Sequence, residues 1–200
     1  VKQGDRVGTI AWNDYRHLEA YYGICGMGAV LHTINPRLHD SQIAYIINHA
    51  EDQVVLIDPD FIEVAERIAH LVPSVRLWVI LGDEAPKSPA AVKYVSYETW
   101  INEERETLIW PELDEWAAAT LCYTSGTTGN PKGVVLDFLA NSKTELLTLE
   151  SNPMKIDFDG KNDFFSYLPL NHIAERIVVE FASFRFGGTI SFTEGLEVFA

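Results

Sequence analysis

The sequence has few cysteines, few basic residues and no long apolar run, and each shortage excludes a class of protein. Its two cysteines, Cys25 and Cys122, form no CxxC pair, so they indicate neither a disulfide framework nor a zinc site. No apolar stretch approaches the roughly 18 residues that a membrane-spanning helix needs. Lys and Arg total 15 against 29 Asp and Glu, a formal net charge of −14. We expect no nucleic-acid partner, because so acidic a chain repels a phosphate backbone, whereas a nucleotide that carries its own magnesium stays compatible.

The 200 residues are enough for one large domain or two small ones, and they have the composition of a globular protein. Hydrophobic residues make up 47% and charged residues 22%, which excludes a disordered tail, a collagen-like rod and a coiled coil. The chain opens on Val1 instead of methionine and stops at Ala200 without a signal that ends an element. We therefore expect an internal part of a longer protein, called the full-length protein below. The absence of paired cysteines favours a reducing, cytoplasmic location, with attachment to the periphery of a membrane left open.

Strand-like and helix-like segments alternate along the chain, which predicts an α/β fold of layered sheets flanked by helices. Asn13 or Asp14 is expected to cap the first helix, and Asp40 or Ser41 the second. The last helix is expected to end at the glycine pair Gly187 and Gly188. The expected strands are 6–12, 29–34, 54–57, 75–81, 117–123, 164–168 and 189–192, and the expected helices are 15–27, 40–50, 61–71, 138–149 and the segment from 173 to the glycine pair.

One segment stands apart because glycines, hydroxyl groups and a lysine directly follow a buried strand. Residues 123–133 read YTSGTTGNPKG. Their glycines let the backbone approach a ligand closely, and the Ser and Thr residues add N–H and O–H donors for phosphate oxygens. Lys132 adds a positive charge on a flexible stem. The segment is not a Walker loop, because Pro131 stands where that loop has its second glycine, and Gly133 follows the lysine. The alternative is a hydroxyl-rich surface turn.

This segment resembles the signature phosphate loop of the adenylate-forming superfamily, which includes acyl-CoA synthetases, luciferases and peptide-synthetase adenylation domains. Further stretches are similar to fatty-acyl-CoA synthetases, so that the resemblance covers about four fifths of the chain. The downstream stretch 166–176, SYLPLNHIAER, looks like a motif that precedes the acyl pocket of long-chain members. The upstream stretches are residues 4–7, 12–13, 17–22, 28–31, 35–38 and 43–50.

The resemblance implies a two-step reaction. A carboxylate attacks the α-phosphate of Mg·ATP and gives an acyl-adenylate and pyrophosphate, after which the thiol of coenzyme A takes the acyl group. The implied catalytic residues are Lys132 and His172, and Thr127 is the implied residue near Mg²⁺. The residues implied in nucleotide binding are Thr124, Ser125, Gly126, Thr127, Thr128, Gly129 and Lys132. The expected partners are thus a fatty acid, ATP and coenzyme A.

The chain lacks later motifs of the superfamily, and one of its stretches has no counterpart there. The Tyr-Gly-x-Thr-Glu segment for adenine and magnesium, the ribose-binding aspartate and the C-terminal lysine are not in the sequence. We therefore expect residues 1–200 to be a single incomplete segment of the large N-terminal AMP-binding domain, without the C-terminal domain and inactive alone. Residues 137–160 match nothing in the family, which leaves divergence and a mosaic junction open.

Other functions stay open beside a fatty-acid–CoA ligase. The full-length protein could activate another carboxylate or load a carrier protein, and the chain could be a non-catalytic nucleotide-binding fragment. For His172 the alternative is a helix-capping or core histidine. We interpret His17 and His49 as scaffold, and Glu175 and Arg176 as members of surface or helix–helix ion pairs.

The first prediction concerns Lys132. In the full-length protein, Lys132→Ala is expected to lower the rate of adenylation more than it raises the KM of the fatty acid, because the lysine would stabilise phosphate charge in the transition state. Pre-steady-state adenylation at saturating ATP measures the rate. An unchanged rate would remove Lys132 from the catalytic residues.

Overall fold

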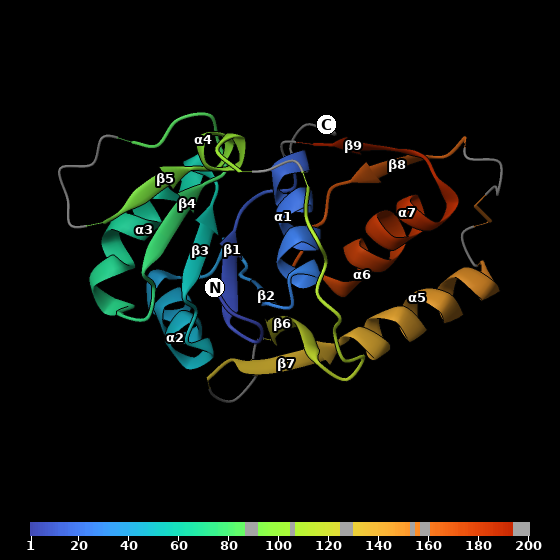
Figure 1. The fold of residues 1–200 in the computed structure, drawn as a ribbon, viewed down its shortest axis with the longest axis horizontal. Coiled ribbons are helices and arrows are strands. Elements are labelled where there is room, and N and C mark those ends of the chain that lie inside the picture. The colour runs from blue at the N-terminus through green and yellow to red at the C-terminus, as the bar shows by residue number, and fades with distance from the viewer. Residues whose placement is uncertain (87–91, 105–106, 125–129, 153–154, 157–160, 194–200) are drawn as a thin grey trace.

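A computed structural model describes residues 1–86, 92–104, 107–124, 130–152, 155–156 and 161–193 (Figure 1). Its centre is a seven-stranded sheet in the order β5-β4-β3-β1-β2-β6-β7. Neighbouring strands are parallel except for β6 and β7, which pair antiparallel at one edge. The strands are β1 (Arg6–Ile10), β2 (Val30–Thr33), β3 (Val54–Ile57), β4 (Leu77–Ile80), β5 (Tyr94–Ser96), β6 (Ala118–Thr124) and β7 (Lys132–Asp137).

Helices cover both faces of this sheet, as the near-continuous apolar strands require. Within β3, Val55 and Ile57 pack with α2 (Asp40–Ala50) and α3 (Ile62–Ile68), which lie on one face. The alternating residues Val54 and Leu56 pack with α1 (Tyr15–Gly26) on the other face. Short helical turns η1 (Pro59–Phe61) and η2 (Ala69–Leu71) flank α3, and α4 (Tyr97–Asn102) follows β5. The sheet is therefore a buried layer whose two faces have separate cores.

A second group of elements lies beside α1 and carries its own small core. Strands β8 (Asp163–Ser166) and β9 (Thr189–Phe192) pair in parallel, and one helical stretch connects them. That stretch consists of α6 (Ile173–Glu175), the π-helical η3 (Arg176–Phe181) and α7 (Ala182–Phe186), and its apolar side packs on β8. Helix α5 (Phe138–Ser151) contacts both β7 and η3, so it joins the edge of the large sheet to this group.

The structure confirms the α/β fold and most of the expected elements. Asp14 caps α1 through a hydrogen bond from the His17 N–H to Asp14 Oδ1, and Gly187, with φ of 71°, ends α7. The expected cap of α2 is wrong: His39 is the N-cap residue, and its ring accepts a hydrogen bond from the Ser41 N–H. The expected helix over 61–71 is three pieces, of which only α3 is α-helical.

Strands β5 and β7 and helix α4 were not predicted from the sequence. β7 lies at the edge of the sheet, and its adjacent residues Val134 and Val135 are both exposed. An edge strand of this kind lacks the alternation of apolar and polar residues by which strands are recognised. Among the described residues, no helix is both long and apolar enough to cross a membrane.

The His17 side chain in α1 contacts β1 and the residues that connect β1 to α1. Its side chain is buried, with Nδ1 3.0 Å from the Trp12 carbonyl oxygen and Nε2 3.0 Å from Thr9 Oγ1. A ring protonated on Nδ1 donates to the carbonyl and accepts from the Thr9 hydroxyl, so the neutral form satisfies both contacts. Burial lowers the pKa of His17 to about 4.

The second prediction follows from this lowered pKa. The unfolded chain binds a proton at His17 below pH about 6.5, whereas the folded protein does so only near pH 4, so stability is expected to fall as pH decreases between these values. A shift of this size corresponds to about 3 kcal/mol in the free energy of unfolding. Urea unfolding of the full-length protein across this range measures it. His17→Gln should flatten the slope and the exposed control His70→Gln should not; equal slopes in all three proteins would contradict the assignment.

Candidate functional site

The glycine-rich segment connects two paired strands at the edge of the large sheet. Thr124 at the end of β6 pairs with Lys132 at the start of β7. Thr124 Oγ1 also lies 3.5 Å from the Lys132 carbonyl oxygen, and both residues are exposed. Ser125, Gly126, Thr127, Thr128 and Gly129, expected to bind phosphate and magnesium, lie outside the described residues. The antiparallel strands β6 and β7 are called the hairpin below, and the pairing of Thr124 with Lys132 is the part of it that borders the glycine-rich segment.

Tyr123 links the base of this hairpin to the helix layer. Its hydroxyl lies 2.7 Å from His49 Nδ1, at the last turn of α2, and its ring packs 5.1 Å from the His32 ring. Burial raises the pKa of Tyr123 to about 12, so the phenol stays protonated at neutral pH. Behind it, His32 Nδ1 lies 2.7 Å from Asp52 Oδ2, and both side chains are fully buried. Tyr123 thus packs beneath the hairpin base, and His49, interpreted as a scaffold residue, has a specific partner.

A cleft of about 360 Å³ opens beside the hairpin and brings distant residues together. Thr124 and Pro131, which both belong to the glycine-rich segment, line it. His172 and Asn171 also line the cleft, as does Thr33 of β2. Apolar side chains, including Leu38, Ile46 and Ile173, complete the lining. The cleft therefore combines hydroxyl groups, a histidine and an apolar surface at the carboxyl ends of β2 and β6.

His172 is exposed and belongs to no core. It is the residue before α6, with φ of −91° and ψ of 125°, yet its side chain caps no backbone N–H of that helix. Its own N–H donates to the Pro169 carbonyl oxygen over 2.8 Å, which closes a tight turn. The interpretation as a capping or core histidine is therefore wrong. Its implied catalytic role stays a prediction.

Arg176 and Glu175 are buried, and hydrogen bonds to backbone and hydroxyl groups take the place of the expected surface or helix–helix ion pairs. Each is 1% exposed. The Arg176 guanidinium donates to the Leu170 carbonyl oxygen at 2.8 Å, to Thr33 Oγ1 at 2.6 Å and to Thr120 Oγ1 at 3.3 Å. The Glu175 carboxylate accepts the Leu168 N–H at 3.1 Å. Both side chains thus bind the backbone just before His172.

Glu180 is a buried carboxyl in the π-helical stretch. It is 1% exposed, and its oxygens have no hydrogen-bond partner among the described residues. Burial raises the pKa of Glu180 to about 8, an effect that the nearby Arg176 charge only partly offsets. The carboxyl is therefore largely protonated at neutral pH. π-Helical turns often occur at functional sites because they place side chains that a regular helix would not.

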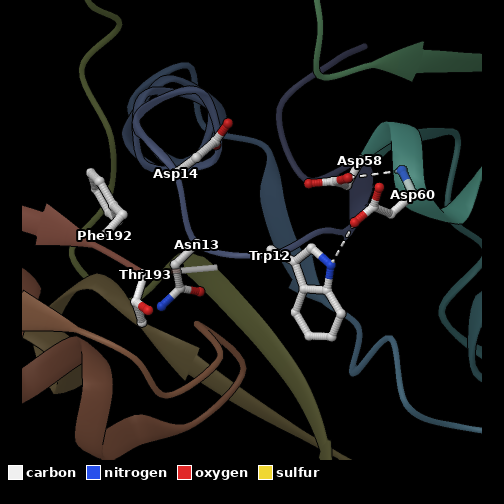
Figure 2. Close-up of a pocket in the computed structure, with 7 residues that line it drawn as sticks. All are labelled: Trp12, Asn13, Asp14, Asp58, Asp60, Phe192 and Thr193. Carbon is white, nitrogen blue, oxygen red and sulfur yellow. Dashed lines mark hydrogen bonds between the residues drawn. The ribbon is translucent and has the colours of Figure 1, made fainter. Parts of the chain in front are cut away.

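A second cavity of about 580 Å³ lies at the carboxyl ends of β1 and β3, and Figure 2 shows its lining. Asp14, Asp58 and Asp60 border it, but each already has a structural partner. Asp14 caps α1, Asp58 Oδ1 accepts the Asp60 N–H at 2.9 Å, and Asp60 Oδ2 accepts the Trp12 indole N–H at 3.2 Å. No group of three or more His, Cys, Asp or Glu suited to hold a metal ion occurs in the described part of the chain.

Of the residues predicted from the sequence, the structure brings Thr124, His172 and, at the hairpin base, Lys132 to one region. It adds residues that the sequence reasoning missed, namely Asn13 and Glu175, whose side chains bind the turn before His172. Both occur in stretches already singled out by resemblance, 12–13 and 166–176. That resemblance was the only signal for them, because their partners are distant in sequence.

Comparison with known families and curated proteins gives one consistent result. A model of a family described as "AMP-binding enzyme" matches residues 1–199. A medium-chain-fatty-acid–CoA ligase of Ectopseudomonas oleovorans is 41% identical over 170 residues, which are 84% of this chain and 31% of that protein. A long-chain-fatty-acid–CoA ligase of Thermus thermophilus is 48% identical over 135 residues, 68% of this chain and 24% of that protein. The chain thus spans a third or less of the length of these relatives.

Solved structures share the fold. The anthranilate CoA ligase AuaEII, solved in complex with anthranoyl-AMP, superposes with a TM-score of 0.88 at 22% identity. The superposition covers 99% of this chain and 37% of the AuaEII chain. The ATP-bound MatB of Rhodopseudomonas palustris gives a TM-score of 0.74 at 20% identity, covering 96% and 35% of the two chains. At this identity the likeness shows the architecture alone.

The third prediction concerns Glu180. A carboxyl with a folded pKa of about 8 and an ordinary unfolded pKa near 4.5 destabilises the fold progressively as pH rises between these values. Glu180→Gln removes the titration and is expected to be more stable than the unmodified protein at pH 8, with the advantage shrinking toward pH 5. Urea unfolding of the full-length protein at both pH values tests this, with the exposed Glu103→Gln as control. An advantage that does not change with pH would contradict the buried, protonated state.

Proposed function

Because the chain belongs to the family of AMP-binding enzymes, we propose that the full-length protein is a fatty-acid–CoA ligase. It would use ATP to convert the fatty acid to an acyl-adenylate and then transfer the acyl group to coenzyme A. The identities of 41% and 48% to fatty-acid–CoA ligases support this substrate class. The observation that carries the proposal is the cleft that His172 shares with Thr124 and Pro131 of the glycine-rich segment.

The hairpin end of the cleft is the proposed place of the nucleotide phosphates. Ser125, Thr127 and Thr128 would donate to the β- and γ-phosphate oxygens, and Lys132 would neutralise their charge. Thr127 would add a hydroxyl near the Mg²⁺ that enters with ATP. Attack of the carboxylate oxygen on the α-phosphorus forms the acyl–phosphate bond and expels pyrophosphate. Positioning and charge neutralisation supply most of the catalysis in such a step.

The His172 end of the cleft is the proposed place of the fatty acid. Its carboxylate would lie beside the exposed ring of His172, between that residue and the hairpin. The apolar lining from Leu38, Ile46 and Ile173 suits the first methylene groups of an acyl chain. The carboxylate oxygen and the α-phosphate would then meet where both ends of the site converge, which is the arrangement that an in-line attack requires.

The remaining parts of the site would come from the rest of the full-length protein. We propose that residues 1–200 are one segment of a large N-terminal domain, in line with the third or less of their relatives that they span. Adenine, ribose and coenzyme A would be bound by later segments, and the segment alone would be inactive. The proposed location is the cytoplasm or the periphery of a membrane.

A different carboxylate is the second candidate. A 3-methylmercaptopropionyl-CoA ligase of Ruegeria pomeroyi is also 41% identical over 170 residues. A short sulfur-containing acid is therefore a specific alternative to a fatty acid as the substrate. Loading of a carrier protein and a non-catalytic nucleotide-binding role are further alternatives. They differ in the acceptor and in whether any adenylate forms.

ATP–pyrophosphate exchange by the full-length protein tests the proposal. A panel of medium- and long-chain fatty acids, 3-methylmercaptopropionate and aryl acids is compared at equal concentration, followed by transfer to coenzyme A. Exchange that is fastest with a fatty acid and acylation of coenzyme A are expected. Fastest exchange with the short or aryl acids would favour the second candidate, and no exchange with any acid would reject the ligase.

The fourth prediction concerns His172 in the same assay. His172→Ala is expected to lower kcat/KM for the fatty acid by about tenfold to a hundredfold, the loss typical of one hydrogen bond to a charged group. The KM for ATP and the melting temperature should stay close to those of the unmodified protein, because the side chain is exposed. His70→Ala, another exposed histidine, is the matched control. Normal exchange by His172→Ala would remove this residue from the site.

A further inference from the structure

The side chain of Asn13 reaches from the large sheet to the segment before His172. Asn13 follows β1 and precedes Asp14, the cap of α1. Its Nδ2 group donates to Ser166 Oγ at 2.8 Å and to the Leu168 carbonyl oxygen at 2.5 Å. Its Oδ1 atom accepts the Leu170 N–H at 3.1 Å. Both ends of one amide therefore hold a single short backbone segment more than 150 residues away in sequence.

Two further side chains bind the same backbone segment. Glu175 Oε2 accepts the Leu168 N–H at 3.1 Å, and the Arg176 guanidinium donates to the Leu170 carbonyl oxygen at 2.8 Å. The backbone N–H and carbonyl groups of both Leu168 and Leu170 thus each bind a side chain. We call Asn13, Glu175 and Arg176 together the turn clamp.

The clamped segment ends at the proposed acyl site. Leu170 is buried, and two residues later His172 is exposed in the cleft. The His172 N–H is bonded back to the Pro169 carbonyl oxygen at 2.8 Å, inside the same turn. A shift of the clamped backbone would therefore also shift His172. Asn13 also lines the neighbouring cavity, where Figure 2 shows its amide beside Thr193 and apart from the hydrogen-bonded pair Asp58 and Asp60.

We propose that Asn13 is a positioning residue for the activation step, acting through His172. The inference rests on the proposed function, because it takes His172 as the residue beside the acyl carboxylate. Asn13 fixes where the imidazole stands relative to the hairpin that holds the phosphates. A misplacement of about 1 Å between reacting groups can cost a hundredfold in rate, so a residue that touches no substrate can still control the step.

The chemistry of the contacts requires an amide at this position. The side chain must donate to the Leu168 carbonyl oxygen with one group and accept from the Leu170 N–H with the other. The amide of asparagine does both, whereas the carboxylate of aspartate has no donor. Aspartate would also place a carboxylate near Glu175 Oε1, which lies 3.5 Å from Asn13 Nδ2. Asn13→Asp should therefore be at least as damaging as Asn13→Ala, although it is the closer match in shape.

The fifth prediction is tested by a double-mutant cycle in the full-length protein. Asn13→Ala, Asn13→Asp, His172→Ala and the double variant of Asn13→Ala with His172→Ala are compared by ATP–pyrophosphate exchange with a fatty acid. Asn48→Ala is the matched control, since Asn48 Nδ2 also donates to a backbone carbonyl oxygen, that of Leu71, at 2.8 Å but away from the cleft. We expect Asn13→Ala alone to lower kcat/KM by about tenfold to a hundredfold relative to the unmodified protein. The double variant should differ from His172→Ala by less than about threefold in kcat/KM. The KM for ATP should change little in every variant.

Hydrogen exchange of backbone amides measures whether the clamp is intact and does not depend on enzymatic activity. The Leu170 N–H loses its acceptor in Asn13→Ala, so peptides covering 166–171 should exchange faster than in the unmodified protein and in Asn48→Ala. Peptides from β1 and α1 should keep their protection, which separates loss of the clamp from general unfolding. Unchanged exchange over 166–171 would overturn the inference.

The outcomes separate the inference from the function on which it rests. Equal losses from Asn13→Ala with and without His172 would show that Asn13 does not act through His172, and the inference would be wrong while the ligase stands. Normal activity of His172→Ala would reject the role of His172 and the inference with it. No exchange by the unmodified protein with any acid would reject the proposed function itself.

Discussion

The buried guanidinium of Arg176 joins the two parts of the fold. A charge removed from water is tolerated only where hydrogen bonds replace its hydration, and the partners of Arg176 come from both sides of the junction. Thr33 and Thr120 belong to adjacent strands of the large sheet, and the Leu170 carbonyl oxygen belongs to the turn after β8. The ring of Tyr21 in α1 lies under the guanidinium at 5.4 Å. Removing any of these partners would leave part of a buried charge uncompensated, so the geometry of the cleft depends on all of them.

The local part of the fold was predictable from the sequence because neighbouring residues determine it. The run Val54–Ile57 is a strand with the expected bounds, and Asp14 caps α1 as its side chain and position suggest. β7 was missed because its pairing with β6, and not any pattern of its own, makes it a strand. His39 was missed as the cap of α2 because an imidazole is an uncommon cap, used here through its ring nitrogen.

The candidate site was predictable where residues lie close in sequence, and not where it depends on long-range contacts. Thr124 and Lys132 lie in one continuous motif and His172 lies in another, so their residue types and spacing are visible in the sequence. Arg176 was expected in a surface or helix–helix ion pair, because only its neighbours along the helix are visible in the sequence. Its partner Thr33 lies 143 residues away in the sequence, although the two side chains are 2.6 Å apart in the structure. The same holds for Asn13. Buried polar contacts are a property of the assembled fold.

The order of the strands also sets an order of assembly. β1 to β5 pair among themselves within residues 6–96, whereas β6 must insert beside β2 after the chain has closed a long loop. Contacts that close long loops form late, and chains fold from the N-terminal side as they leave the ribosome. Among the described strands within residues 1–96, none pairs with the side of β2 that β6 occupies in the complete sheet, so this side depends on β6 for its backbone partners. Pairing of β6 with β2 places Thr120 on the strand next to that of Thr33, but the cleft and the surroundings of Arg176 are complete only when the turn that carries Leu170 and His172 packs against these strands, so the site requires both parts of the fold.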